Sequence, residues 1–401
     1  MKTYINSFKC LLLAGAVIAV LTGCNSAPNE QKTQREEANR QWNQARAGVM
    51  HNLAKDQFQV GNFDKARSTV DEALNVDPES VQLYVLSARI AIEQNRLDLA
   101  DKQLAEARKR DEKNADALYL SGVVAQRWQK PEQALDFYTK ASEAHPTELA
   151  YLLARSEMLV MLNRRPEAIS ALQDKLVYFE HSAAIRDAVA QIHMQDKRYT
   201  QAADLFRQAS ILAGDDLSIR ERLATAQFFA GDYKAATETL NKLLLKEPYT
   251  DRGDLFMLFG ESQLAINRNV EARQAFEKAT DLDSSSVTAW LGLTKAALAL
   301  NDIRRAEGAV RRAVSLSPEL ADVHLMLGYV RLKQDRADDA IRSFQTANSL
   351  DPKDSVSLCM IGHVLEKQGR YDEALSWYAR ALKVNPQDEL ALRLMVTAQI
   401  E

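Results

Sequence analysis

One residue type recurs every 34 positions through most of this 401-residue chain, and this recurrence restricts the fold more than any other feature. When residues 47–388 are divided into ten repeats of 34 residues, position 20 is alanine in every repeat. The ten alanines are Ala66, Ala100, Ala134, Ala168, Ala202, Ala236, Ala272, Ala306, Ala340 and Ala374. A period of this length predicts a stack of similar structural units. The repeats begin at residues 47, 81, 115, 149, 183, 217, 253, 287, 321 and 355, and Asp251 and Arg252 are an insertion before the seventh.

Two further positions are also reserved for small side chains. Position 27 is alanine in eight repeats, and Lys175 and Leu243 are the exceptions. Position 8 is Gly, Ala or Ser in nine repeats, and Thr294 is its largest residue. Because two helices approach closely only where their side chains are small, positions 8, 20 and 27 are expected to mark helix crossings.

Residues that begin and end helices occupy fixed positions between these columns. Position 15 is Gly or Asn in seven repeats, which favours the left-handed conformation that ends a helix. Position 32 is proline in six repeats, which is typical of the end of a second helix. Position 34 carries a helix-capping side chain in eight repeats: Ser80, Asn114, Ser182, Asp216, Thr250, Ser286, Asp354 and Asp388. Each repeat is therefore predicted to be a helix A, a tight turn, a helix B and a second turn.

The final repeat shows the complete pattern. It contains Leu358, Ile361, Gly362, Leu365, Ala374, Tyr378, Ala381 and Pro386. This pattern resembles the tetratricopeptide repeat (TPR), over about 85% of the chain. The resemblance implies an all-α fold, a single right-handed α-solenoid of ten helix-turn-helix units, with residues 389–401 as a capping helix. A generic helical bundle does not predict an alanine every 34 residues.

The first residues have the pattern of an export signal. Lys2 and Lys9 precede an apolar run from residue 10 to residue 21, which is typical of a secretory signal. The following Leu21-Thr22-Gly23-Cys24 resembles the bacterial lipobox. The resemblance implies that residues 1–23 are a lipoprotein signal peptide and that Cys24 is lipidated. An ordinary cleaved signal or an uncleaved anchor is the alternative.

Residues 24–46 are expected to connect this anchor to the repeats. Asn25 follows the cysteine, and by resemblance to Gram-negative sorting rules it favours the periplasmic face of the outer membrane. Residues 25–36 are polar and are predicted to form a flexible tether. Residues 37–46, which contain Trp42, are long enough to form a short helix in front of the first repeat.

The sequence contains no recognisable catalytic motif. It has neither a glycine-rich phosphate-binding loop nor a His-Glu-x-x-His sequence, and the six histidines are spread over different repeats. Cys359, at position 5 of the last repeat, is expected to act as a small hydrophobic residue. The formal net charge of −4 is unlike that of a dedicated nucleic-acid binder. We therefore predict a non-catalytic protein with no cofactor, no metal site and no nucleic-acid partner.

Surface residues are then the candidates for function. In TPR proteins, positions 2, 5, 9, 12 and 13 of the A helices line a concave groove, and here that lining is largely apolar and aromatic. A peptide or helix with an apolar face would fit such a groove; the alternative is that adjacent repeats bury part of it. The candidate residues are Tyr119, Val123, Gln126, Leu153, Glu157, Val160, Met161, Met257, Glu261, Leu264, Leu291, Lys295, Leu298, Leu325, Tyr329, Leu332, Cys359 and His363.

Two irregular regions are weaker candidates. Arg304, Arg305, Arg311 and Arg312 share one face of the predicted helix B of repeat 8. They would contact anionic headgroups or an acidic partner, or would simply be solvated. Repeats 4 to 6 depart from the pattern, and this departure is either a bend or partner site or ordinary divergence between repeats. The departures are Lys175, Glu180, Arg220, Leu243 and the inserted Asp251-Arg252.

These features together predict a membrane-anchored TPR scaffold that binds other envelope proteins. The chain resembles the TPR lipoproteins that accompany pilus and secretin assembly, which implies a role in building a cell-envelope complex. The alternatives are a component of polysaccharide export or secretion machinery, and a docking adaptor for a peptidoglycan enzyme or a protease.

Overall fold

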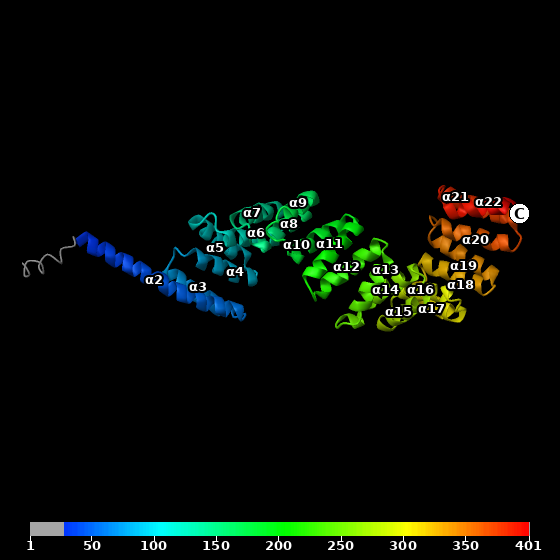
Figure 1. The fold of residues 1–401 in the computed structure, drawn as a ribbon, viewed down its shortest axis with the longest axis horizontal. Helices are drawn as coiled ribbons and strands as arrows, with labels where there is room; N and C mark the ends of the chain where they lie inside the picture. The colour runs from blue at the N-terminus through cyan, green and yellow to red at the C-terminus, as the bar shows by residue number, and fades with distance from the viewer. Residues whose placement is uncertain (1–27, 401) are drawn as a thin grey trace, which may run out of the picture. The chain divides into compact units, whose positions relative to one another are not determined.

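The computed structural model describes residues 28–400, which form twenty-one α-helices, one 3-10 helix and, within that range, no strand (Figure 1). The chain divides into two compact units, of which unit 1 ends at Tyr178 and unit 2 begins at Phe179. None of the described helices is long and apolar enough to cross a bilayer. The predicted signal peptide and Cys24 lie outside the described residues.

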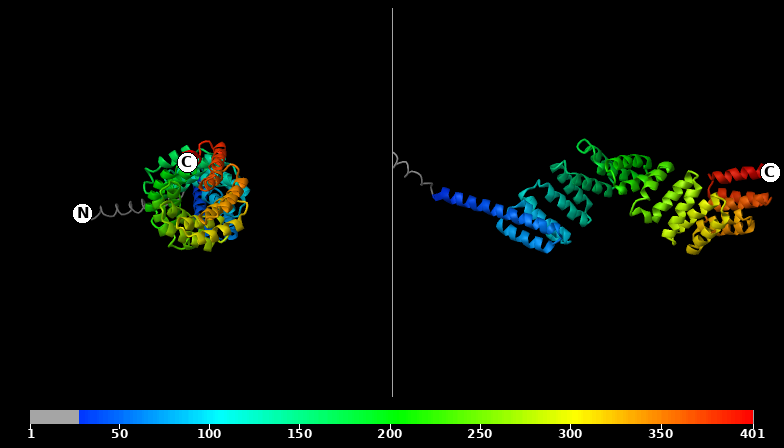
Figure 2. Two further views of the ribbon diagram at one scale, coloured as in Figure 1. Left: turned by 90° about the vertical axis from the view of Figure 1, so that its right-hand side faces the viewer. Right: turned by 60° about the horizontal axis from the view of Figure 1, so that its bottom comes forward.

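Unit 1 contains four helical hairpins. Its helices are α2 (Pro28–Gln59), α3 (Phe63–Val76), α4 (Val81–Glu93), α5 (Leu97–Arg110), α6 (Ala115–Arg127), α7 (Pro131–Ala144), α8 (Leu149–Met161) and α9 (Arg165–Gln173). Helices α4, α6 and α8 begin at residues 81, 115 and 149, where the sequence register starts a new repeat. Successive hairpins lie side by side in both ribbon views (Figures 1 and 2).

Unit 2 contains six hairpins and one final helix. Its helices are α10 (Ala183–Gln195), α11 (Tyr199–Leu212), α12 (Leu217–Phe229), α13 (Tyr233–Leu243), the 3-10 helix η1 (Tyr249–Asp251), α14 (Gly253–Ala265), α15 (Asn269–Leu282), α16 (Val287–Ala299), α17 (Ile303–Leu316), α18 (Ala321–Lys333), α19 (Ala337–Leu350), α20 (Ser355–Lys367), α21 (Tyr371–Val384) and α22 (Glu389–Ile400). All six A helices begin at a repeat start of the sequence register, and α22 occupies the segment assigned to the capping helix. The all-α prediction is therefore confirmed.

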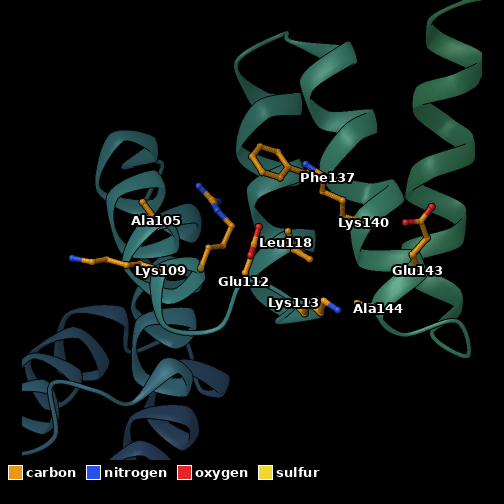
Figure 3. A pocket seen from close by; sticks show the side chains of 10 residues that line it. Ala105, Lys109, Glu112, Lys113, Leu118, Phe137, Lys140, Glu143 and Ala144 are labelled. Carbon is orange, nitrogen blue, oxygen red and sulfur yellow. The ribbon is translucent and has the colours of Figure 1, made fainter.

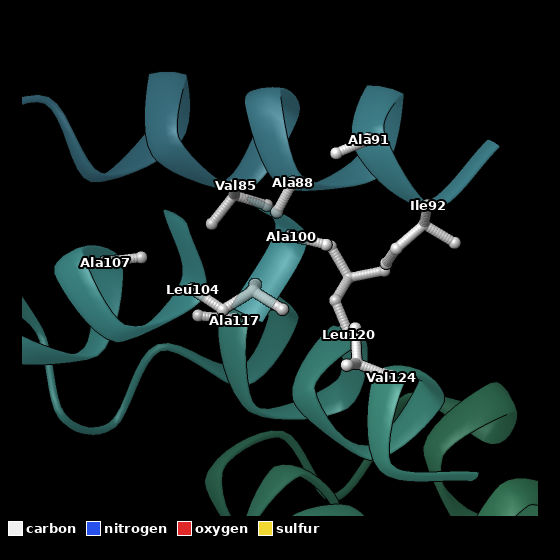
Figure 4. Close-up of a cluster of buried hydrophobic side chains, with 10 residues drawn as sticks. All are labelled: Val85, Ala88, Ala91, Ile92, Ala100, Leu104, Ala107, Ala117, Leu120 and Val124. Carbon is white, nitrogen blue, oxygen red and sulfur yellow. The ribbon is translucent and has the colours of Figure 1, made fainter. Parts of the chain in front are cut away.

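The small-residue positions are helix crossings, as their composition predicts. All ten alanines of position 20 are completely buried, and the eight alanines of position 27 are at most 1% exposed. Figure 4 shows the arrangement in unit 1, where Ala88 of α4 and Ala100 of α5 face the larger side chain of Leu104. Because alanine has no side chain beyond Cβ, the two helices lie close together. The Leu104 side chain then fills the remaining space between them.

Position 15 adopts the left-handed conformation in all ten repeats, with φ between 56° and 79°. The sequence predicted this for seven repeats, and the structure extends it to Gln129, Lys197 and Asp335. The geometry after α4 is typical: the Arg96 amide donates to the Ala91 carbonyl at 2.8 Å, which ends the helix and reverses the chain.

The predicted helix caps are present in six of the eight cases. The side chains of Asn114, Ser182, Asp216, Ser286, Asp354 and Asp388 accept hydrogen bonds from backbone amides of the first turn that follows. Ser80 makes no such bond. Thr250 lies within η1, where its hydroxyl donates to Glu247, and the residue that precedes α14 is Arg252. The predictions for Ser80 and Thr250 are therefore wrong.

The N-terminal connection differs from the prediction. One continuous helix, α2, covers residues 28–59, so the segment expected to be a flexible tether through residue 36 is helical from Pro28 onward. Proline is well tolerated at the first position of a helix. The Gln, Glu, Arg and Ala residues that follow have high helix propensity. The polar composition that resembled a tether therefore belongs to a solvated helix.

The boundary between the two compact units follows helix α9, the second helix of repeat 4. Helix α9 contains nine residues, whereas helix B of the preceding hairpin contains fourteen. Lys175 occupies position 27, which is buried alanine in eight other repeats, and a lysine cannot be buried there without a charged partner. The helix ends at Gln173, and successive tight turns that include Leu176 N to Gln173 O follow.

The insertion before the seventh repeat is part of the packing of unit 2. Leu243 replaces the alanine of position 27 and is 1% exposed, in a cluster with Tyr249 and Leu255. Arg252 is held by carboxylates on both sides, because its Nη2 lies 2.8 Å from both Glu221 and Asp254. The extra residues thus accommodate the larger leucine and link the insertion to the preceding A helix.

Candidate functional site

The predicted groove residues of unit 1 form a connected aromatic and polar network. The Tyr119 ring lies between two other tyrosine rings, with centroids 5.5 Å from Tyr138 and 4.9 Å from Tyr151. The Tyr138 hydroxyl donates to Gln126 at 2.7 Å, and the Gln126 amide donates to Glu157 at 3.2 Å. Burial raises the pKa of Tyr138, so this phenol stays protonated and keeps its hydrogen bond.

Other candidates in unit 1 differ in how far they reach the solvent. Val123, Leu153 and Val160 are half-buried, whereas Glu157 and Met161 are exposed. Part of the apolar lining in unit 1 is therefore only partly open to a partner.

In unit 2 two of the candidates are buried. Leu291 is 8% exposed because it packs against Ala313 and Val323. Cys359 is completely buried beside Ala381, where burial raises the pKa of its thiol to about 12. Neither side chain is available to a partner in this conformation.

The remaining candidates of unit 2 lie at or near the surface. Glu261 and Lys295 are exposed, and six are half-buried: Met257, Leu264, Leu298, Leu325, Tyr329 and Leu332. The Tyr329 ring packs edge-on against Phe344 with centroids 5.5 Å apart. Half-buried His363 has its Nδ1 3.8 Å from Glu366, and burial lowers the pKa of the imidazole, so it is neutral at pH 7. Of these candidates, Leu325, Tyr329 and Leu332 pack against the buried cluster that contains Phe344.

A hollow of about 870 Å³ lies in unit 1, on residues that the sequence analysis did not select (Figure 3). It is bounded by α5 on one side and α7 on the other, and Leu118 of α6 and Phe137 of α7 give it an apolar floor. Four basic and two acidic side chains surround this floor. The lining residues are Ala105, Arg108, Lys109, Glu112, Lys113, Leu118, Phe137, Lys140, Glu143 and Ala144.

Arg108 is the half-buried cation of this hollow, and no carboxylate of the described chain forms an ion pair with it. Its guanidinium donates to the Ser121 hydroxyl and lies 4.9 Å from the centroid of the Phe137 ring. Burial lowers the pKa of Arg108, which reflects the cost of removing this charge from water. A charged group with a hydroxyl and a ring as its partners can still accept an anionic ligand.

Its neighbour Arg110 has the opposite environment. The Arg110 guanidinium lies 2.6 Å from Glu106 and 3.4 Å from Glu79, and over the Tyr84 ring at 4.4 Å. Both carboxylates come from the chain itself, so Arg110 is already neutralised. The basic sequence Arg108-Lys109-Arg110 followed by Lys113 is the signal that could have indicated this hollow, but which arginine is neutralised depends on the packing.

Comparison with known proteins assigns the family. Residues 179–401 match a TPR family model described as the cilia and flagella-associated protein 70 C-terminal domain, and residues 40–122 match the tetratricopeptide repeat model. The chain belongs to the TPR family. The hollow between α5 and α7 therefore lies on two B helices of a TPR protein, and the predicted groove residues lie on its A helices.

Individual relatives are distant. The TPR repeat-containing protein MJ1428 of Methanocaldococcus jannaschii is 23% identical over 265 residues, which are 60% of this chain and 45% of that protein. Human protein O-mannosyl-transferase TMTC3 is 23% identical over 278 residues, 68% of this chain and 30% of that protein. This chain thus spans less than half the length of either relative. The crystal structure of yeast Tom70 aligns with a TM-score of 0.42 and 13% identity, over 89% of this chain and 88% of that one.

The arginines of TPR repeat 8 are partly neutralised. Arg305 pairs with Glu277 and lies 3.5 Å from Asp302, and Arg311 lies 2.5 Å from Glu307. Arg304 and Arg312 are exposed. The structure thus divides the predicted arginine face into two paired and two solvated side chains. Among residues 28–400, no group of three or more His, Cys, Asp or Glu side chains is placed to hold a metal ion.

Proposed function

We propose that this TPR protein is a non-catalytic scaffold, and that the hollow between α5 and α7 binds an acidic, amphipathic segment of a partner protein. The observation that supports this most directly is Arg108, a half-buried cation at an apolar floor that forms no ion pair within the described residues; the charge of Asp101 acts on it only from beyond ion-pair distance. A carboxylate of the partner would supply the missing counter-ion. A hydrogen bond between two charged groups is stronger than one between neutral groups.

The rest of the hollow fits the same ligand. Phe137 and Leu118 provide an apolar contact surface for one or two hydrophobic side chains of the partner. Lys109 and Lys113 are exposed at its edge and would attract acidic residues from a distance. Binding should therefore weaken as the salt concentration rises, because the attraction between exposed charges is screened.

The experiment uses a short fluorescent peptide with leucines on one helical face and glutamates beside them, and fluorescence anisotropy as the readout. Arg108→Gln should weaken binding about tenfold or more, because a hydrogen bond between charged groups contributes about 1.5–3 kcal/mol. Arg110→Gln is the matched control: it removes the same charge from the same helix but from a side chain paired with Glu106, and it should change affinity little. Equal affinities for both variants, or tighter binding of a lysine-for-glutamate peptide, would refute the site.

We further propose that the scaffold is lipid-anchored through Cys24 at the periplasmic face of the outer membrane of a Gram-negative bacterium. The support is the sequence Leu21-Thr22-Gly23-Cys24 that follows the apolar run. Several acyl chains on one residue anchor a protein stably, because each buried methylene contributes about 0.8 kcal/mol. Cys24→Ala should move the protein from the membrane fraction to the soluble fraction, and continued membrane association would contradict the proposal.

For the pathway, we propose that this scaffold assists assembly of a pilus or secretin complex. Polysaccharide export and the docking of a peptidoglycan enzyme or protease remain the alternatives. Photo-crosslinking from position 137 in living cells distinguishes these pathways. A crosslinked secretin or pilin would support pilus or secretin assembly, and an export component would support polysaccharide export. A crosslinked peptidoglycan hydrolase or protease would support the docking role. The same crosslinker at position 245, an exposed residue of unit 2, is the control.

A further inference from the structure

Helix α2 carries an exposed stripe of large apolar side chains. Trp42, Val49, Leu53 and Val60 are 70%, 71%, 50% and 79% exposed, the last of them directly after the helix end at Gln59. The opposite side of the helix is occupied, because Ala47 and Ala54 are buried against α3 and α4. The stripe is thus a second, unpartnered face of the same helix.

The repeat register explains why this face is open. Val49 and Leu53 occupy positions 3 and 7 of the first repeat. In the later repeats of unit 1, position 3 is buried against the preceding helix B: Leu83 packs with α3, and Tyr151 packs against Ala141 of α7. Position 7 behaves alike, since Ser121 accepts a hydrogen bond from Arg108 of the preceding helix α5. No helix precedes α2 among residues 28–400, so within that range nothing covers the surface that in later repeats receives a helix.

The stripe has the spacing of a coiled-coil seam. Arg46 and Asp56 lie on the same face as the apolar side chains, and the six residues alternate at intervals of four and three. This is the a/d pattern of a heptad repeat. The seam residues are Trp42, Arg46, Val49, Leu53, Asp56 and Val60. From residue 42 to residue 60 there are 18 steps along the helix, so at about 1.5 Å per step the stripe extends for about 27 Å.

We propose that the stripe binds the same stripe of a second copy of this chain. The two α2 helices are antiparallel, and the twofold axis passes between them at the level of residue 51. In this arrangement Trp42 of each copy faces the partner subunit's Val60, and Val49 faces the partner subunit's Leu53. Every apolar residue then meets an apolar residue. Such a self-complementary surface closes as a dimer and does not extend into a fibre.

Charge determines the orientation. In the antiparallel pair Arg46 faces the partner subunit's Asp56, and this contact occurs twice. Both side chains are exposed in α2, and no ion pair within the described chain involves either of them. A parallel pair would instead place arginine against arginine and aspartate against aspartate, which is unfavourable. A helix of an unrelated protein is not expected to carry the same symmetric order of apolar, basic and acidic residues.

The first test is a charge-reversal series measured by sedimentation velocity on the full chain. The parent should be a dimer. Arg46→Asp and Asp56→Arg should each weaken dimerisation about tenfold or more, because each places like charges together at two sites. Mixing the two variants should produce a heterodimer, and the double variant should dimerise again. A monomeric parent, unaffected single variants, or a mixture that does not pair would overturn the proposal.

The second test fixes the direction of the helices by disulfide formation. Trp42→Cys combined with Val60→Cys should give an oxidised dimer, because each new cysteine faces the other kind in the partner. Trp42→Cys alone should not crosslink beyond the level of the unsubstituted chain, since the two copies of position 42 would be about 27 Å apart. Crosslinking by the single variant would indicate a parallel pair and overturn the arrangement. Unchanged thermal unfolding shows that each variant is folded.

Discussion

At the residue scale, the side chains at positions 8 and 24 are matched in size in most repeats; the exception is repeat 5, where Phe206 stands at position 24 and Ala190 at position 8. Where position 24 carries Tyr138, Phe276, Phe344 or Tyr378, position 8 is glycine, and a Cβ at that glycine would overlap the ring. Where position 24 is Leu104 or Leu240, position 8 is alanine. All ten residues of position 24 are at most 1% exposed, so the pair fills a closed space between helix A and helix B.

This matching predicts the effect of adding one methyl group. Gly328→Ala should lower the stability of unit 2, because overpacking against the buried Phe344 ring costs about 1–3 kcal/mol. The better helix propensity of alanine offsets only about 1 kcal/mol of this. The midpoint of urea unfolding measures the net effect.

Two further variants separate packing from propensity. Gly308 lies in α17 with no atom within 4 Å of an added Cβ, so Gly308→Ala should raise the midpoint. Combining Gly328→Ala with Phe344→Leu reproduces the alanine–leucine pair of other repeats and should recover part of the lost stability. A Gly328→Ala variant as stable as the parent would contradict the size-matching argument.

Cys359 gives a prediction in terms of pH. Its pKa is raised to about 12 by burial, whereas an unfolded thiol titrates near about 8.5. Above a pH of about 8.5 the thiol of the unfolded chain loses a proton that the buried thiol of the folded chain keeps. The unfolding free energy should therefore decrease as the pH rises from about 8.5 towards 12. Cys359→Ala should show a smaller alkaline decrease, and an equal decrease in both proteins would contradict the assignment.

The sequence alone predicted the structural role of some of these residues but not of others. The alanines of positions 20 and 27 could be assigned to crossings because their type is constant. Gln129, Lys197 and Asp335 could not be assigned to the left-handed conformation, since their side chains do not require it and only the surrounding turn imposes it. The pairing of positions 8 and 24 was present in the sequence, but position 24 varies from valine to tyrosine and does not form a column of one residue type.

At the scale of single helices, α9 shows how one substitution shortens an element. Lys175 stands where alanine is buried in eight repeats, and the helix ends before it. Lys175→Ala should allow α9 to continue by about one turn, because the residue that could not be buried is removed. Hydrogen exchange of amides 174–178 should slow. Lys102→Ala, at an exposed position of α5, is the control and should leave this segment unchanged.

Helix α2 shows the limit of composition as a guide to structure. Residues 28–36 are polar enough to be predicted as a tether, yet they form the first turns of a 32-residue helix.

The hollow between α5 and α7 was not predicted from the sequence. Its cations occupy B-helix positions that vary between repeats, and only packing shows that Arg110 is paired whereas Arg108 is not.

At the scale of the whole molecule, the chain consists of two units that each have their own buried clusters. A fragment comprising residues 179–401 should therefore fold alone, since it contains six hairpins and the final helix α22. Its far-UV circular dichroism should show a helical protein with a cooperative thermal transition. An unfolded fragment would show that unit 2 depends on unit 1 for its stability.

The packing of Phe276 affects how such a chain can change length. This ring lies against Gly260 of its own repeat and also against Gly292 of the next one, where a Cβ would overlap it. If the seventh repeat were duplicated, the phenylalanine would face position 6 of a copied helix α14. That position is Leu258 and not a glycine. Gain or loss of repeats during evolution is thus easiest at junctions without such a shared ring. Neighbouring repeats joined by one are expected to be inherited together.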